Sequence, residues 1–286
     1  MRYEAPETLG AAVTLLHGEA GLARPLAGGT DLLVQLRAGT VAPDLVVDLK
    51  RIPEMRRITA ENGGFRIGAA VTGAELGEHP DLKTAWPGVV EAAELIGSTQ
   101  IQGRASLGGN LCNASPAADS VPAMIAAAAT ATVAGPRGRR ELPVEEIVVA
   151  PGRTSLARDE IVVAINLPRR PAHSGDAYLR FIPRTEMDIA VVGAGVSLTL
   201  DGAGLCSHAR VALGAVAATP VLVPDAAAAL IGTAGDEDAL TRLAEAASAA
   251  CRPIDDKRGT KAYRIKVAGV MARRAAEIAF ERARSC

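Results

Sequence analysis

Aromatic side chains and net charge are both scarce in this sequence. Its 286 residues include one Trp, three Tyr and three Phe, and 31 basic side chains are balanced by 32 acidic ones. A protein that binds nucleic acid needs a basic surface and, for single strands, aromatic side chains on which bases stack. We therefore expect no nucleic-acid partner.

Long apolar segments are also absent. The longest, residues 121–135, is too short and too rich in alanine to span a bilayer, so we expect no membrane span. The first six residues lack the basic and then apolar pattern of a secretory signal. Together these features predict a cytoplasmic protein.

Metal-binding and catalytic patterns are missing as well. The cysteines form no CxxC pair, and the histidines are isolated from one another and from the cysteines. We therefore expect no metal site and no catalytic residue in this chain. The residues concerned are Cys112, Cys206, Cys251, Cys286, His17, His79, His173 and His208.

The spacing of apolar residues indicates mixed helices and strands. It predicts a first helix over residues 7–17 with Thr8 as its N-cap, then a short strand over 24–27. A second helix is predicted to begin at Thr30 and to end before Gly39. Residues 187–200 are rich in valine and glycine, which predicts a long strand.

The segment Pro168-Arg169-Arg170-Pro171 is the best linker candidate, because two prolines within four residues disfavour both helix and sheet. It separates an α+β portion from a smaller portion of sheet and helices. In the second portion, helices are predicted at 224–231, 236–251 and 260–284. The basic residues of the last helix form either a solvated face or part of an interface between subunits.

The first candidate site is the segment Ala27-Gly28-Gly29-Thr30-Asp31. Two glycines let an anion approach the backbone, and their N–H groups join the free N–H groups at the start of the predicted helix. The segment is thus suited to hold a phosphate. Taken alone, the motif is a weak signal, because a glycine pair before a capped helix is an ordinary chain reversal.

The second candidate site, Ala105-Ser106-Leu107-Gly108-Gly109-Asn110-Leu111, repeats the glycine pair. Ser106 and Asn110 can donate hydrogen bonds to phosphate oxygens, and Asp119 can accept them from ribose hydroxyls. Two such loops indicate a diphosphate ligand. Taken alone, Asp119 is also explained as a charge that interacts favourably with a helix start.

Two common nucleotide-binding motifs are absent. No GxGxxG follows a predicted strand and no GxxxxGK[ST] occurs, which argues against a doubly wound dinucleotide fold and against a P-loop. A bound dinucleotide must be held by a different fold.

Four segments in order resemble the FAD-binding medium subunits of molybdenum hydroxylases, a family that includes flavin subunits of aerobic carbon monoxide dehydrogenase and of xanthine dehydrogenase-type enzymes. The similarity covers essentially the whole chain. The segments are AGGTDLLVQLR at 27–37, ASLGGNLCNASPAADSVPAM at 105–124, TEMDIAVVGAGVSL at 185–198 and DDKRGTKAYRIKVAGVMARRA at 255–275.

The resemblance implies an α+β fold. Its FAD-binding domain would be of the vanillyl-alcohol-oxidase type (PCMH-like) with two α+β subdomains, followed by a C-terminal domain with a three-stranded antiparallel sheet and helices. We accordingly predict an FAD-binding domain at 1–170, with subdomains at about 1–55 and 56–170, and a C-terminal domain at 171–286.

The resemblance also implies which residues bind FAD. The two glycine loops would hold the pyrophosphate, Asp119 would contact the ribose or ribityl hydroxyls, and Asp188 with Ile189 would approach the isoalloxazine ring. Tyr178 and Phe181 are candidates to cover that ring, with core packing as the alternative for both. The predicted cofactor-binding residues are Ala27, Gly28, Gly29, Thr30, Asp31, Leu32, Ile96, Gly97, Ser106, Gly108, Gly109, Asn110, Asp119, Asp188 and Ile189.

The function implied by the resemblance is electron transfer. A large molybdopterin-binding subunit would act on the substrate, and a small subunit with [2Fe–2S] clusters would pass electrons to the FAD of this chain and on to an external acceptor, in a dimer of heterotrimers. A stand-alone FAD-dependent oxidase or reductase of the vanillyl-alcohol oxidase type is the alternative. A third hypothesis is a nucleotide-binding regulatory module without redox chemistry. Such a protein would be colourless, so a visible spectrum distinguishes it from a flavoprotein.

Overall fold

The computed structural model describes residues 1–185 and 187–285; Glu186 and Cys286 lie outside the described residues. Its N-terminal part is a small parallel sheet in the order β1-β3-β2, with α1 and α2 in the connections. Thr8 caps α1, because its hydroxyl accepts a hydrogen bond from the N–H of Ala11. The elements are β1 (Arg2–Glu4), α1 (Leu9–Gly18), β2 (Ala23–Leu26), α2 (Leu32–Arg37) and β3 (Leu45–Asp48).

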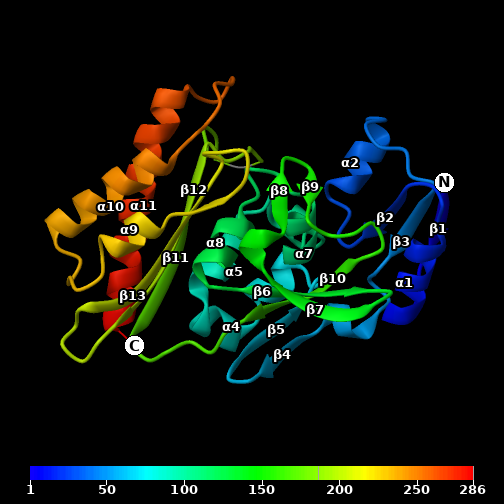
Figure 1. Ribbon diagram of the computed structural model, residues 1–286, viewed down its shortest axis with the longest axis horizontal. Coiled ribbons are helices and arrows are strands. Elements are labelled where there is room, and N and C mark those ends of the chain that lie inside the picture. Colours follow the sequence, from blue (N-terminus) through cyan, green and yellow to red (C-terminus); the bar gives the residue numbers. More distant parts are fainter. Residues whose placement is uncertain (186, 286) are drawn as a thin grey trace.

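An antiparallel sheet in the order β4-β5-β10-β6-β7 forms the centre of the molecule. Short helices and a two-stranded hairpin, β8 with β9, surround it (Figure 1). The strands are β4 (Ile58–Glu61), β5 (Gly64–Gly68), β6 (Thr130–Gly135), β7 (Gly138–Pro143), β8 (Val148–Ala150), β9 (Arg153–Thr154) and β10 (Ile161–Leu167). The helices are η1 (Pro53–Arg56), α3 (Gly73–Gly77), α4 (Pro80–Ala85), α5 (Pro87–Glu94), α6 (Thr99–Gln102), α7 (Leu107–Cys112), α8 (Ser120–Ala126) and η2 (Val144–Glu146).

The C-terminal part is an antiparallel sheet in the order β11-β12-β13-β14 with three helices. The three long strands of this sheet confirm the predicted three-stranded arrangement, and the two-residue strand β14 extends it at one edge. The elements are β11 (Ser174–Phe181), β12 (Val192–Leu200), β13 (Cys206–Gly214), β14 (Val221–Leu222), α9 (Pro224–Ala228), α10 (Glu237–Ala250) and α11 (Lys261–Arg284).

The C-terminal sheet lies between two groups of helices, with α10 and α11 on one face and α5 and α8 on the other (Figure 1). Glycines allow close approach on both faces. A Cβ on Gly175 would lie 1.9 Å from the carbonyl oxygen of Ala279 in α11, and a Cβ on Gly195 would lie 2.7 Å from that of Pro122 in α8. The C-terminal sheet is therefore packed directly against the part of the chain that carries the glycine loops.

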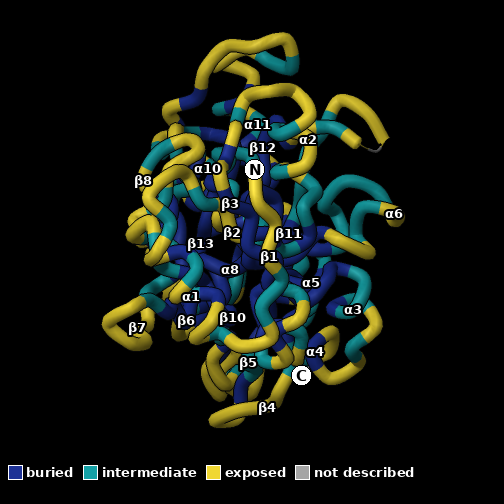
Figure 2. Tube along the Cα trace, turned by 90° about the vertical axis from the view of Figure 1, so that its right-hand side faces the viewer, coloured by how far each residue is buried: buried dark blue, intermediate teal, exposed yellow. Residues whose placement is uncertain are grey.

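Burial follows this layering. Residues of β11, β12 and α8 lie in the interior, whereas β4 and β7 lie at the periphery and are largely exposed (Figure 2). The side chains of Tyr178 and Ala212, from the C-terminal sheet, belong to the same apolar core as those of β10 and α8. Among the described residues, no helix combines the length and the apolar character that crossing a bilayer requires.

Several element boundaries differ from the predictions. The regular part of the second helix begins at Leu32 and not at Thr30, because the chain reverses at Gly29 (φ +81°) and residues 30 and 31 form a turn. The long strand predicted from residue 187 begins at Val192. The preceding segment contains Met187 with φ +53°, a conformation incompatible with a strand.

Candidate functional site

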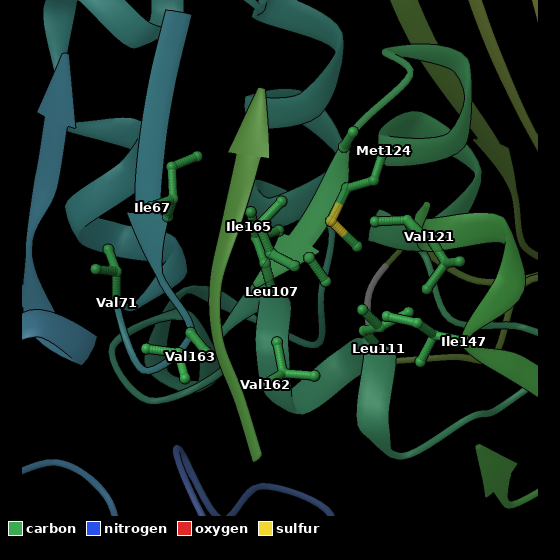
Figure 3. Packing of buried hydrophobic residues seen from close by; sticks show 14 of the residues in the cluster. Ile67, Val71, Leu107, Leu111, Val121, Met124, Ile147, Val162, Val163 and Ile165 are labelled. Carbon is green, nitrogen blue, oxygen red and sulfur yellow. The ribbon is translucent and has the colours of Figure 1, made fainter. Parts of the chain in front are cut away.

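The second glycine loop is held by helix α7. Leu107 and Leu111 point into the buried core (Figure 3), whereas Gly109, Asn110 and Cys112 of the same helix are not buried. Ser106 caps this helix, since its hydroxyl accepts a hydrogen bond from the N–H of Gly109 at 3.1 Å. The capping bond leaves the hydroxyl hydrogen of Ser106 available to a ligand.

The two glycines of this loop have different roles. A Cβ on Gly108 would lie 2.5 Å from the Cβ of Ala69, so Gly108 is required for α7 to pack against the core. A Cβ on Gly109 would meet only the Ser106 hydroxyl at 3.1 Å and the Cβ of Ala27 at 4.0 Å. Gly109 therefore faces the first glycine loop across an open space.

The first glycine loop packs directly against the second. A Cβ on Gly28 would lie 1.8 Å from the carbonyl oxygen of Arg104, a distance that no side chain permits. The ammonium group of Lys50 holds the other side of the loop by donating to the Ala27 carbonyl at 3.0 Å and to Asp48 at 2.8 Å. The loops at 27–31 and 105–111 are far apart in sequence but lie side by side in the structure, as expected for two loops that hold one diphosphate.

The first loop presents backbone donors that the described part of the chain leaves unpaired. Among the described residues, none accepts a hydrogen bond from the N–H groups of Gly28, Gly29, Thr30 or Asp31. Consecutive free N–H groups form a concave site of positive potential, which favours an anion. Burial of the Asp31 carboxyl group raises its pKa, although the residue as a whole is exposed.

Both loops line one cavity of about 340 Å³. Most of the predicted cofactor-binding residues lie in its wall, namely Ala27, Gly28, Gly29, Thr30, Asp31, Leu32, Ile96, Ser106, Gly108, Gly109 and Asn110. Residues that the sequence did not indicate complete the wall. They include Arg24, Gln35, Met55, Asn113, Thr154, Arg158 and Ile161.

Of the predicted residues that the structure describes, Gly97, Asp119, Asp188 and Ile189 lie outside this lining. Gly97 adopts φ +66° directly after Ile96, so it shapes the turn that brings Ile96 to the cavity. Asp188 accepts hydrogen bonds from Arg258 at 2.8 Å and from its neighbour's N–H, which lower its pKa. Ile189 is exposed.

Asp119 is the N-cap residue of helix α8 and is buried against strand β11. Its carboxylate accepts hydrogen bonds from the Tyr178 hydroxyl at 3.2 Å and from Arg180 at 3.0 Å. Burial raises the pKa of Asp119 to about 6, and both partners oppose this rise only in part. The aromatic candidates are engaged in the protein: Tyr178 is buried on Asp119, and Phe181 packs edge-on against Tyr263.

Cys112 lies in the cavity wall next to Asn113. Its surface is open to the cavity, while the surrounding protein desolvates the thiol and raises its pKa to about 12. A raised pKa disfavours the thiolate, which is the reactive form of a cysteine. No group of three or more His, Cys, Asp or Glu side chains within residues 1–185 and 187–285 is placed to hold a metal ion.

Comparison with known families assigns both parts of the chain. A family described as "FAD binding domain in molybdopterin dehydrogenase" matches residues 1–170, and one described as "CO dehydrogenase flavoprotein C-terminal domain" matches residues 177–279. These matches confirm the resemblance that the four sequence segments indicated.

Individual relatives agree over nearly the whole chain. The carbon monoxide dehydrogenase medium chain of Hydrogenophaga pseudoflava is 34% identical over 98% of this chain and 97% of its own length. A putative xanthine dehydrogenase FAD-binding subunit of Escherichia coli K12 is 33% identical over 95% of this chain and 93% of its own. This chain belongs to the FAD-binding subunits of the molybdenum hydroxylases, which are oxidoreductase components.

Solved structures agree on the fold. The chain matches the carbon monoxide dehydrogenase of H. pseudoflava that lacks the Mo-pyranopterin moiety, with a TM-score of 0.94, 35% identity and coverage of 99% of this chain and 98% of that one. Quinoline 2-oxidoreductase from Pseudomonas putida 86 matches with a TM-score of 0.90, 27% identity and the same coverage. The predicted fold class is confirmed.

Proposed function

We propose that this chain is the FAD-carrying electron-transfer subunit of a molybdenum hydroxylase. In this role it accepts electrons from the [2Fe–2S] clusters of a small partner subunit and passes them to an external acceptor. The observation that carries the proposal is the meeting of two glycine loops around one cavity, with four consecutive backbone N–H groups that find no acceptor among the described residues.

The residues present fit a dinucleotide. The unpaired N–H groups of the first loop suit the diphosphate, and the absence of a Cβ at Gly109 leaves room beside them. Asn110 uses its side-chain oxygen to accept from Ser120, so its amide N–H groups remain to donate to a ligand. We assign Asp119, Asp188 and Ile189 to the ribityl and ring end, by family resemblance.

FAD supplies the redox chemistry, since a flavin exchanges electrons singly with clusters and in pairs with an acceptor. The chain's own contribution is to bind and orient the cofactor. Lys50 fixes the first loop, Ser106 fixes the start of α7, and Gln35 joins α2 to the end of α7 through Asn113. Each of these contacts positions a wall of the cavity.

The proposed assembly is a dimer of heterotrimers in the cytoplasm, with a large molybdopterin-binding subunit and a small [2Fe–2S] subunit. The names of two relatives, a medium chain and an FAD-binding subunit, support a place in a multisubunit enzyme. We also propose the domain division at residue 170. It is supported by the separate sheets before and after the Pro168–Pro171 linker.

The test begins with the chain alone. Purified protein mixed with FAD should retain one FAD per chain after gel filtration and should show a flavin absorption spectrum. It should not turn over hydroxylase substrates. Coexpression with a small iron–sulfur subunit and a large molybdopterin subunit should give a complex in which substrate reduces the flavin.

Two results would contradict the proposal. A protein that binds no FAD would exclude the flavoprotein assignment, and it would favour the regulatory module. A flavoprotein that oxidises a substrate without partner subunits would favour the stand-alone oxidase. In that case the cavity assignment would stand while the relay would not.

A further inference from the structure

Arg180 lies where the C-terminal sheet meets the part of the chain that carries the glycine loops. It belongs to β11, and only 5% of its side chain is exposed. Its Nη1 atom donates to the carboxylate of Asp119 at 3.0 Å and to the carbonyl of Leu95 at 2.6 Å. One buried nitrogen of the C-terminal sheet therefore contacts two segments of the N-terminal part of the chain, the end of α5 and the start of α8.

The first of these segments leads directly into the cavity. Leu95 is followed by Ile96, which lines the cavity wall, and by Gly97 with φ +66°. The bond from Arg180 to the Leu95 carbonyl thus fixes the backbone at the base of this turn. Loss of the bond would leave a partly buried carbonyl without that donor and would release the turn.

The second segment reaches the cavity through helix α8. Asp119 stands at the start of this helix, and the next residue, Ser120, donates from its N–H and its hydroxyl to the side-chain oxygen of Asn110, at 3.2 and 2.7 Å. Asn110 lines the cavity beside Gly109. The Arg180–Asp119 pair thereby holds the residue that orients Asn110.

We propose that Arg180 is a positioning residue for the cofactor: it ties the C-terminal sheet to two walls of the cavity and so controls how tightly FAD is retained. The inference rests on the proposed function, since it assumes that the cavity takes FAD. It gives strand β11 of the C-terminal domain a role in the cofactor site, although no residue of β11 lines the cavity among the described residues.

Arg282 provides a matched control. It also crosses the interface, from α11 to Glu91 in α5 and to the carbonyl of Asp176 at 2.7 Å, and its side chain is partly buried. Neither Glu91 nor Asp176 lines the cavity described here. The Glu91 carbonyl accepts from the N–H of Leu95, so Arg282 loads the same helix α5 one turn earlier, but a variant at Arg282 removes neither hydrogen bond of Arg180.

The experiment measures the rate of FAD release from the holoprotein after dilution, by the recovery of flavin fluorescence, together with the melting temperature of each apoprotein. We expect Arg180→Met to release FAD at least about tenfold faster, as the loss of a charged hydrogen bond implies. Arg282→Met should lower the melting temperature but release FAD within about twofold of the wild-type rate, because its contacts end outside the cavity wall.

Conservative replacement separates positioning from general packing. Both bonds of Arg180 come from one nitrogen, so the single ammonium group of a lysine can donate to the same two acceptors. Arg180→Lys should therefore recover much of the retention that Arg180→Met loses. Should the methionine variant fail to fold, Arg180→Gln carries the same expectation, because it keeps a polar side chain that is too short to reach both acceptors.

The outcomes are distinct. If the wild-type protein does not take up FAD, the proposed function fails. If the wild-type protein binds FAD and a folded Arg180→Met or Arg180→Gln protein releases it at the wild-type rate, only the role of Arg180 is refuted. Equal acceleration in Arg282→Met and Arg180→Met would also refute that role, because it would trace the effect to interface stability.

Discussion

Gln35 donates a hydrogen bond of 3.1 Å from its side-chain amide to the side-chain oxygen of Asn113. Gln35 lies in α2, which follows the first glycine loop, and Asn113 is the C-cap of α7, which carries the second. None of the residues of α2 is buried, and this bond connects that helix to the second loop. It lets each loop restrain the other.

We expect this contact to support FAD binding cooperatively. Gln35→Ala and Asn113→Ala should each weaken FAD binding, and the double variant should be weaker than the wild type by less than the sum of the two effects. The coupling should be about 1 kcal/mol, the usual net value of such a bond. Titration of the four proteins with FAD measures it. Strictly additive losses would show that the two residues act independently.

The two glycine loops should respond differently to a new side chain. Gly109→Val places methyl groups in the cavity and presses only on the Ser106 hydroxyl, 3.1 Å from the new Cβ, so FAD affinity should fall at least about tenfold while the melting temperature falls less than in Gly28→Val. Gly28→Val forces a Cβ into the Arg104 carbonyl and should cost roughly 2–3 kcal/mol of stability. The measurements are FAD titration and thermal unfolding. Wild-type FAD affinity in Gly109→Val would contradict the site.

Asp119 should give the protein a specific pH dependence. Burial raises its pKa to about 6 in the folded chain, against about 3.9 when unfolded. The folded state therefore favours the protonated form, so this contribution to stability is fully present below about pH 4 and is lost as the pH rises to about 6.

Thermal unfolding of the apoprotein between pH 4 and 7 tests whether the stability contribution of Asp119 falls as the pH rises. The difference in melting temperature, wild type minus Asp119→Asn, should fall as the pH rises, because the asparagine does not titrate. Other carboxyl groups are common to both proteins and cancel in the difference. A difference that stays constant across this range would show that Asp119 does not titrate there.

The sequence predicts the individual segments of the site well, but it does not predict which residues of distant segments contact one another. The glycine pairs at 28–29 and 108–109 were recognisable because close approach to a ligand requires glycine in a local pattern. Lys50, Gln35 and Arg180 were missed, since each acts through a partner that is distant in sequence and no spacing rule reveals it. The wall formed by residues 152–162 has little regular structure and no motif.

Boundaries were wrong where the backbone departs from regular conformations. The start of α2 was placed at Thr30 because Thr is a good cap, but the chain reversal at Gly29 delays the regular helix. The positions of Asp188 and Ile189 near the ring stay a prediction, since the structure places them outside the cavity lining that it describes. Family resemblance contributed these residues, and local chemistry did not.

Amide hydrogen exchange with and without FAD tests the central claim most directly. The N–H groups of residues 28–31 have no acceptor among the described residues, so they should exchange rapidly in the apoprotein. One equivalent of FAD should slow exchange at residues 28–31 and at 106–110 together. FAD that binds while leaving either loop unprotected, or that protects only a distant region, would contradict the account.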